Sequence, residues 1–191
     1  MNKKAVGPGT ILYPMPVLII GSEVDGKPNF MTASWAGIAC STPPMISVSF
    51  QPKRHTYKGV RANRTFSVNI PSVAQMKEAD YCGIVSGNDG ADKAADCGFE
   101  IFHGTLEGAP MIGQCPVSLE CSVVITLQLG SHDLVVAEIK EVHVSEDCLT
   151  SDGKIDPVKV NPIAFSVPDR NYRGVGDVVG KAFSVGKELK G

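Results

Sequence analysis

The stretch Val-Ser-Leu-Glu-Cys-Ser-Val-Val-Ile-Thr-Leu-Gln-Leu, residues Val117–Leu129, decides the fold class. It is rich in β-branched residues, and Asp133–Val144 repeats that character after the turn Gly130-Ser131-His132. Such residues favour extended strands, and a short turn can join two strands only as antiparallel neighbours. The two segments therefore predict a long antiparallel hairpin.

The rest of the chain reads as short strands separated by turns. Its 20 glycines and 13 prolines lie between short apolar runs, with the tight-turn pair Asp25-Gly26 after the first run. The expected strands are Pro16–Val24, Asn29–Ala36, Met45–Phe50 and Phe66–Ile70, and the tail from Asp147 is expected to be loop-rich with a short apolar piece, Ile163–Val167. The pattern predicts a mainly β, antiparallel protein, most economically a small closed barrel.

A few short helices are expected between the strands. Thr56 can cap a helix that runs to about Ala62. Ser72 and Gln75 match a capping box, which predicts a second helix toward Ile84. The polar stretch Ser86–Asp96, which carries Lys93, is expected to be a loop.

Length and charge narrow the classes of protein. The 191 residues predict one domain, 1–191, and the net charge of −2 with no basic stripe argues against nucleic-acid binding. The longest apolar run, Val17–Ile20, is too short to span a membrane, and no signal peptide is recognised. A cytoplasmic protein is expected.

The cysteines and the absent motifs exclude further classes. None of the six cysteines forms Cys-x-x-Cys or stands at zinc-ligand spacing from a histidine, so we expect free, mostly buried thiols and no metal. Cys82 stands apart, because it lies in the glycine-punctuated stretch Asp80–Gly83. No nucleophile elbow, P-loop or Rossmann fingerprint occurs. The stretch Gly174-Val175-Gly176 does not match the Rossmann pattern Gly-x-Gly-x-x-Gly, because three residues instead of two separate Gly176 from Gly180.

Asn29-Phe30-Met31-Thr32-Ala33-Ser34-Trp35 is the first candidate for a binding segment. The small side chains of Ala33 and Ser34 let a planar ligand approach backbone N–H and C=O groups at a strand end. Trp35 is expected either as a wall of that pocket or as a core residue.

Arg54-His55-Thr56 is the second candidate. It precedes an expected helix, whose N-terminus favours an anion, and Arg54 adds a planar fork that suits phosphate oxygens. The alternative is a capped helix with a solvated arginine. Together the two segments suggest a phosphorylated aromatic cofactor, with flavin mononucleotide (FMN) as the candidate.

His132 and Lys93 are two further candidates for functional residues, and each also has an interpretation without a function. His132 is either a proton donor near a reduced ring or a turn histidine bonded to its neighbour. Lys93 is either a solvated loop charge or a cation that stabilises the negative charge of a reduced flavin.

Several motifs, in this order, resemble the flavin reductase-like, FMN-binding split-barrel family, and most closely its flavoredoxin branch. The resemblance spans nearly the whole chain and is carried by their joint order and spacing. The motifs are Asn29–Trp35, Arg54–Tyr57, Phe66–Pro71, Asp80–Gly83, Ser86-Gly87 with Asp92-Lys93, Leu119–Cys121, Gly130–Asp133 and Tyr172 before Gly174.

The resemblance implies an antiparallel Greek-key split β-barrel that forms a homodimer, with one FMN near each subunit interface. By position, it implies that Lys93 and His132 act on the flavin ring. The implied cofactor-binding residues are Asn29, Met31, Thr32, Ala33, Ser34, Trp35, Ser49, Gln51, Arg54, His55, Thr56, Lys93, His132, Phe165 and Tyr172.

The activity implied is oxidoreduction through bound FMN, with electrons exchanged with NAD(P)H or a redox partner protein. The cofactor supplies the redox chemistry and the barrel supplies orientation and electrostatics. An NAD(P)H-dependent flavin or ferric reductase, and a non-catalytic flavin-binding barrel, are the alternatives, because fold alone does not select a function.

Overall fold

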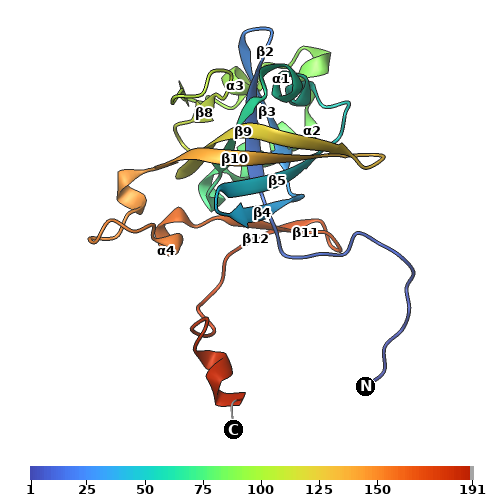
Figure 1. Ribbon diagram of the computed structural model, residues 1–191, viewed down its shortest axis with the longest axis vertical. Helices are drawn as coiled ribbons and strands as arrows, with labels where there is room; N and C mark the ends of the chain where they lie inside the picture. Colours follow the sequence, from blue (N-terminus) through green and yellow to red (C-terminus); the bar gives the residue numbers. More distant parts are fainter. Residues whose placement is uncertain (190–191) are drawn as a thin grey trace.

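The computed structural model describes residues 1–189 and shows a barrel with two extended terminal arms (Figure 1). A seven-stranded antiparallel sheet has the order β3-β2-β6-β9-β10-β5-β4 and forms the body. Its strands are β2 (Leu18–Val24), β3 (Lys27–Ala33), β4 (Ala36–Ser41), β5 (Pro44–Phe50), β6 (Thr65–Ile70), β9 (Val117–Gln128) and β10 (Asp133–Val144).

Smaller elements cover the barrel. A three-stranded sheet joins β1 (Met15–Pro16), β11 (Ile163–Ser166) and β12 (Asn171–Gly174), while β7 (Ile101–Phe102) pairs with β8 (Met111–Ile112). The α-helices are α1 (His55–Asn63), α2 (Met76–Ile84), α3 (Lys93–Asp96) and α4 (Pro157–Val160). Four 3₁₀ turns lie at Val73–Gln75, Gly87–Asp89, Glu146–Cys148 and Val185–Leu189.

The long hairpin is confirmed. β9 and β10 pair from Asp133 with Gln128 to Val144 with Val117, interrupted by two register shifts. The tight turn after β2 is also present, with Asp25 at φ 51° and Gly26 at φ 74°, as a two-residue hairpin turn requires. The predicted fold class, a mainly β antiparallel barrel with few short helices, is therefore confirmed.

The end of β3 lies beside the end of β5. The backbone N–H of Ser49 donates to the carbonyl of Trp35 at 2.9 Å, which extends the β4–β5 pairing by one residue toward the end of β3. Inside the barrel, the apolar side chains of β2, β5, β6 and β9 form one buried cluster, and Phe50 stacks on Tyr57 with ring centroids 4.8 Å apart. This core holds the strand ends that line the site described below.

Several details differ from the sequence-based expectations. The strand expected over Asn29–Ala36 ends at Ala33, because the chain bends at Ser34 and Trp35 before β4 begins. The loop expected over Ser86–Asp96 contains α3, and β12 was not expected.

The expected cap is also different. Thr56 is not the N-cap of α1, because the helix begins one residue earlier and Arg54 occupies the cap position. The buried hydroxyl of Thr56 donates instead to Asn29 Oδ1 at 2.8 Å. The capping box of Ser72 and Gln75 is confirmed.

Candidate functional site: a cavity where β3 meets β5

A cavity of about 370 Å³ lies where β3 ends beside the C-terminal end of β5; we call it the cofactor cavity. Its volume falls within the range of ordinary small-molecule sites. Its lining residues come from β3 and the bend after it, the end of β5, the turn before α1, the β9–β10 turn and β11. They are Met31, Thr32, Ala33, Ser34, Trp35, Ser49, Gln51, Arg54, His132 and Phe165. All ten belong to the set that the sequence predicted.

Trp35 and His132 form one wall of the cofactor cavity. Their rings stack with centroids 4.7 Å apart and planes 27° from parallel. Trp35 is 40% exposed, so it is a wall rather than a core residue. A hydrogen bond of 2.9 Å between Ser131 Oγ and His132 Nδ1 fixes the imidazole from the turn side. The other imidazole nitrogen, Nε2, forms no hydrogen bond with any residue from 1 to 189.

Three polar side chains of the cavity have no partner in the described part of the chain and are free to bind a ligand. Ser34, Ser49 and Gln51 are half-buried, and their side chains form no hydrogen bond within residues 1–189. These hydroxyl and amide groups line an open cavity without a partner from the described residues, so a polar ligand could bond them without breaking any hydrogen bond of the fold. This donor and acceptor set fits the heteroatom edge and the ribityl hydroxyls of a flavin.

Arg54 lies at the end of the cofactor cavity that is next to α1. Its Nη1 donates to the carbonyl of Gly83 at 2.9 Å, which holds the guanidinium between α1 and the end of α2. No side chain caps the N-terminus of α1, whose nine residues begin directly after Arg54. A guanidinium beside free helix N–H groups favours a phosphate.

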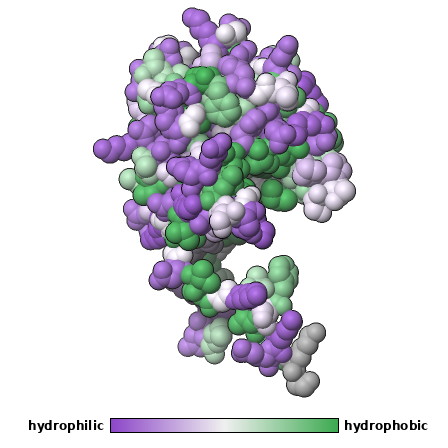
Figure 2. Space-filling view, turned by 90° about the vertical axis from the view of Figure 1, so that its left-hand side faces the viewer, coloured by the Kyte–Doolittle hydropathy of each residue, from purple (hydrophilic) through white to green (hydrophobic). Residues whose placement is uncertain are grey.

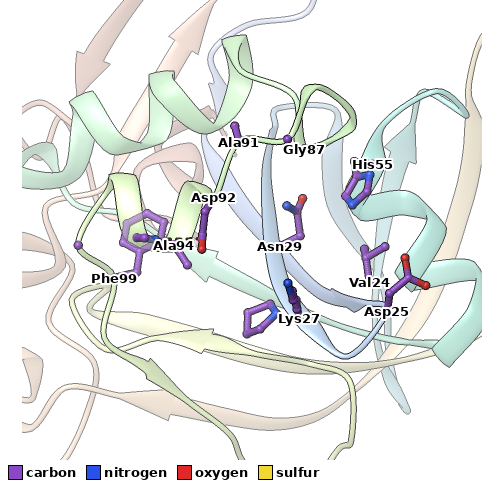
Figure 3. Close-up of a pocket in the computed structure, with 14 residues that line it drawn as sticks. Val24, Asp25, Lys27, Asn29, His55, Gly87, Ala91, Asp92, Ala94 and Phe99 are labelled. Atoms are coloured by element: carbon purple, nitrogen blue, oxygen red, sulfur yellow. Dashed lines mark hydrogen bonds between the residues drawn. The ribbon is translucent and has the colours of Figure 1, made fainter.

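Five of the implied residues lie elsewhere, and Lys93, described below, is one of them. Asn29 and His55 line a different cavity at the other end of β3 (Figure 3). Thr56 is buried and donates to Asn29. Tyr172 donates its hydroxyl to Asp80 at 2.7 Å, and its ring packs 5.8 Å from that of Phe165. Tyr172 therefore supports Phe165 rather than lining the cavity itself.

Lys93 is buried behind β3 instead of lining the cofactor cavity. It is only 3% exposed, and its Nζ donates to the carbonyls of Phe30 (2.8 Å) and Cys82 (3.1 Å). Burial lowers the pKa of Lys93. Its amino group thus lies behind the strand that forms the cavity wall. This position is neither that of a solvated loop charge nor that of a cation facing the ring, the two expectations from the sequence.

Cys82 is fully buried in the apolar cluster between α2 and β2. Burial raises the pKa of its thiol well above the ordinary value, so the reactive thiolate is disfavoured. Within residues 1–189, no group of histidine, cysteine or acidic side chains could hold a metal ion. Over the same residues, no helix is long and apolar enough to cross a bilayer.

The fold and the cavity define a flavin-binding split barrel, and the comparisons agree. Residues 10–159 match the family described as flavin reductase like domain, so the chain belongs to that family. This supports a flavin-related redox function and confirms the predicted family.

Within that family, the chain is similar to two flavoredoxins of known structure. That of Methanosarcina acetivorans is 39% identical, with 98% of this chain and 100% of the other covered, at a TM-score of 0.92. That of Desulfovibrio vulgaris (Miyazaki F) is also 39% identical, with 97% and 100% covered, at a TM-score of 0.90.

A relative from Aeropyrum pernix, an uncharacterized protein, is 31% identical over 72% of this chain. The match spans only 52% of that longer relative.

Proposed function

We propose that the protein is an FMN-dependent oxidoreductase of flavoredoxin type, which carries electrons through FMN bound in the cofactor cavity. The carrying observation is the convergence of ten predicted residues from separate segments on one cavity. The family match and the 39% identity to two flavoredoxins support FMN as the cofactor.

Each wall has a role in this proposal. FMN, when bound, supplies the redox chemistry. Arg54 and the N-terminus of α1 hold the phosphate, while Ser34, Ser49 and Gln51 bind polar atoms of the ring and ribityl chain. Trp35 shields one side of the ring from water and fixes the position of His132 through their stacked contact.

Charge around the ring sets the electron affinity of the site. His132 is placed to donate a hydrogen bond or a proton at the edge of the cavity through Nε2, and Lys93 contributes a positive charge from behind β3. A positive charge near the ring favours its reduced, negatively charged form. Both residues are therefore proposed to raise the reduction potential.

We also propose that the working form is a homodimer. Edge strand β4 is exposed, with Ile38 73% accessible, and the hairpin tip exposes Leu127 and Leu129. The open side of the cofactor cavity continues into a 570 Å³ groove that shares Ser34, Trp35 and Ser49 with it. Apolar surface of this kind next to a site is typical of an interface.

The C-terminal arm adds to this apolar surface. It extends from the body and carries exposed apolar side chains, including Val179 and Phe183 (Figure 2). A second subunit seated on the groove beside the cofactor cavity would also close the cavity.

The proposed electron donor is NAD(P)H or a redox partner protein, in the cytoplasm. The visible spectrum of the purified protein, followed by identification of the released cofactor, tests the central claim. We expect a yellow protein that retains FMN through gel filtration and elutes as a dimer. A protein that takes up no FMN on titration would overturn the proposal. Rapid NAD(P)H oxidation that requires added free flavin would identify a flavin reductase instead.

A further inference from the structure

A second cavity of about 700 Å³ lies at the other end of β3, between the β2–β3 turn, the start of α1 and α3 (Figure 3). It shares no lining residue with the cofactor cavity. Its size would accommodate a drug-sized ligand. The proposed function gives it no role.

Asn29 presents a hydrogen-bond donor to this second cavity. The residue is only 8% exposed, and its Oδ1 accepts from Thr56 Oγ1 at 2.8 Å. Because that bond occupies the oxygen, the amide nitrogen is left for the cavity, and it donates to no group within residues 1–189. The side chain is more than nine-tenths buried, and its amide nitrogen, which has no partner in the part of the chain that the structure describes, is accessible only from the cavity that Asn29 lines.

His55 presents an acceptor beside this donor. Asn88 Nδ2 donates to the carbonyl of Lys53 at 2.9 Å, which turns Asn88 Oδ1 toward His55 Nδ1, also at 2.9 Å. Since an amide oxygen only accepts, Nδ1 carries the hydrogen, and Nε2 of the neutral ring is an acceptor. Nε2 has no partner among the described residues.

Gly87 keeps the corner between these two groups open. A side chain there would place its Cβ 2.8 Å from Asn29 Nδ2 and 2.8 Å from His55 Cδ2. The donor and the acceptor therefore flank the same small space, which only a residue without a side chain leaves free. Asn29 and His55 both lie toward this space in the close-up (Figure 3).

The remaining walls suit an aromatic ring that carries a sugar. Phe99 and small alanines give an apolar side, while Asp25 and Asp92 outnumber the one cation, Lys27. This balance disfavours a polyanion, but carboxylates accept readily from ribose hydroxyls. An adenine ring offers an acceptor nitrogen next to an amino donor, the pattern that an asparagine side chain reads in nucleic acids.

We propose that the second cavity binds an adenine nucleoside: a ring nitrogen accepts from Asn29 and the 6-amino group donates to His55 Nε2. The ligand is either free or the adenosine half of a larger cofactor. The site stands on its own geometry, so it does not depend on the function proposed for the cofactor cavity.

Calorimetric titration of the FMN-loaded protein with adenosine tests the site. We expect saturable binding below about 1 mM, and purine riboside, which lacks the 6-amino group, to bind roughly three- to tenfold more weakly. Ala95→Phe fills the cavity from an exposed position of α3 and should abolish binding. Ala62→Phe, also on an exposed helical position but outside the cavity, is the matched control and should bind as the wild type does.

Asn29→Asp tests the chemistry rather than the space. It keeps the acceptor for Thr56 but replaces the donor by a carboxylate oxygen, so adenosine affinity should fall at least tenfold. Competition by NADH would identify the adenosine half of that cofactor as the ligand, and no competition would identify a free nucleoside. The proposal is overturned if adenosine does not bind the wild type, or if Ala95→Phe binds it with unchanged affinity.

Discussion

Two polar regions of the barrel differ in how their hydrogen bonds are satisfied. In the cofactor cavity, the side chains of Ser34, Ser49 and Gln51 form no hydrogen bond within residues 1–189. On β9, by contrast, the fully buried Glu120 accepts from Leu106 N (2.6 Å) and Thr105 Oγ1 (3.3 Å).

A third partner completes the environment of Glu120. His143 Nε2 lies 2.7 Å from its Oε1, and any side chain at Gly104 would collide with the carboxylate. Both carboxylate oxygens of Glu120 are hydrogen-bonded to protein groups, and no space is left there for a ligand. In the cofactor cavity, by contrast, three polar side chains have no partner among residues 1–189 and the space beside them is open. The first arrangement stabilises the fold, and the second is available for binding.

Glu120→Ala should give the largest effect, and the effect should be on the stability of the fold rather than on FMN binding. It leaves the Leu106 N–H without its partner and removes packing under Gly104, so we expect unfolding of the apoprotein to become easier by about 3 kcal/mol. Urea unfolding measures the loss. FMN affinity of the folded fraction should stay unchanged, and a parallel loss of FMN affinity would contradict a purely structural role.

Arg54→Ala should lower the affinity for FMN. Loss of a charge-assisted phosphate contact, worth about 2 kcal/mol, predicts FMN affinity lowered roughly 30-fold in a fluorescence titration. Arg61→Ala on the same helix is the control, because Arg61 contacts the Tyr57 ring and lines no part of the cofactor cavity. Equal effects of the two variants would exclude a phosphate site at Arg54.

The sequence predicted the cavity better than it predicted the saturated site. Alternation and turn chemistry placed β5, the β2–β3 turn and the long hairpin, because these signals are local. β4 was missed, since the small, exposed residues of Ala36–Ser41 show no alternation. The partners of Glu120 and the burial of Lys93 depend on contacts between distant segments, which no local pattern encodes.

Low pH should remove the contribution that ionised Glu120 makes to the stability of the fold. Burial acts to raise the pKa of Glu120, but hydrogen bonds from His143, Leu106 and Thr105 outweigh it and hold the pKa below the ordinary value. A carboxyl whose pKa is lower in the folded state stabilises the fold above its unfolded pKa. That contribution is lost as the pH falls through the folded pKa. The stability difference between wild type and Glu120→Gln should therefore narrow from pH 6 to pH 3 in urea unfolding, and a constant difference would refute this account.

Ser49→Ala gives the most direct contrast with Glu120. Its hydroxyl has no partner among the described residues, so removing it should leave the stability of the apoprotein within about 0.5 kcal/mol. A lost hydrogen bond to FMN predicts roughly fivefold weaker binding. Ser145→Ala is the control, because Ser145 is also half-buried, forms no side-chain hydrogen bond with the described residues and lies outside the cofactor cavity and the groove. A loss of apoprotein stability with unchanged FMN affinity would show that Ser49 stabilises the fold, as Glu120 does, and does not bind FMN.

Lys93→Met should give the smallest effect, because the charge acts on the ring through β3 rather than by contact. The buried ammonium is neutralised in this variant, and the reduced, negatively charged flavin loses on the order of 1 kcal/mol of stabilisation. For a two-electron couple this lowers the FMN midpoint potential by about 20 mV, which a dye-equilibrated redox titration resolves. Lys93→Arg keeps the charge and should keep the potential. If Lys93→Met retains FMN with an unchanged potential, Lys93 only satisfies the carbonyls of Phe30 and Cys82, and it belongs with Glu120 among the saturated groups of the fold.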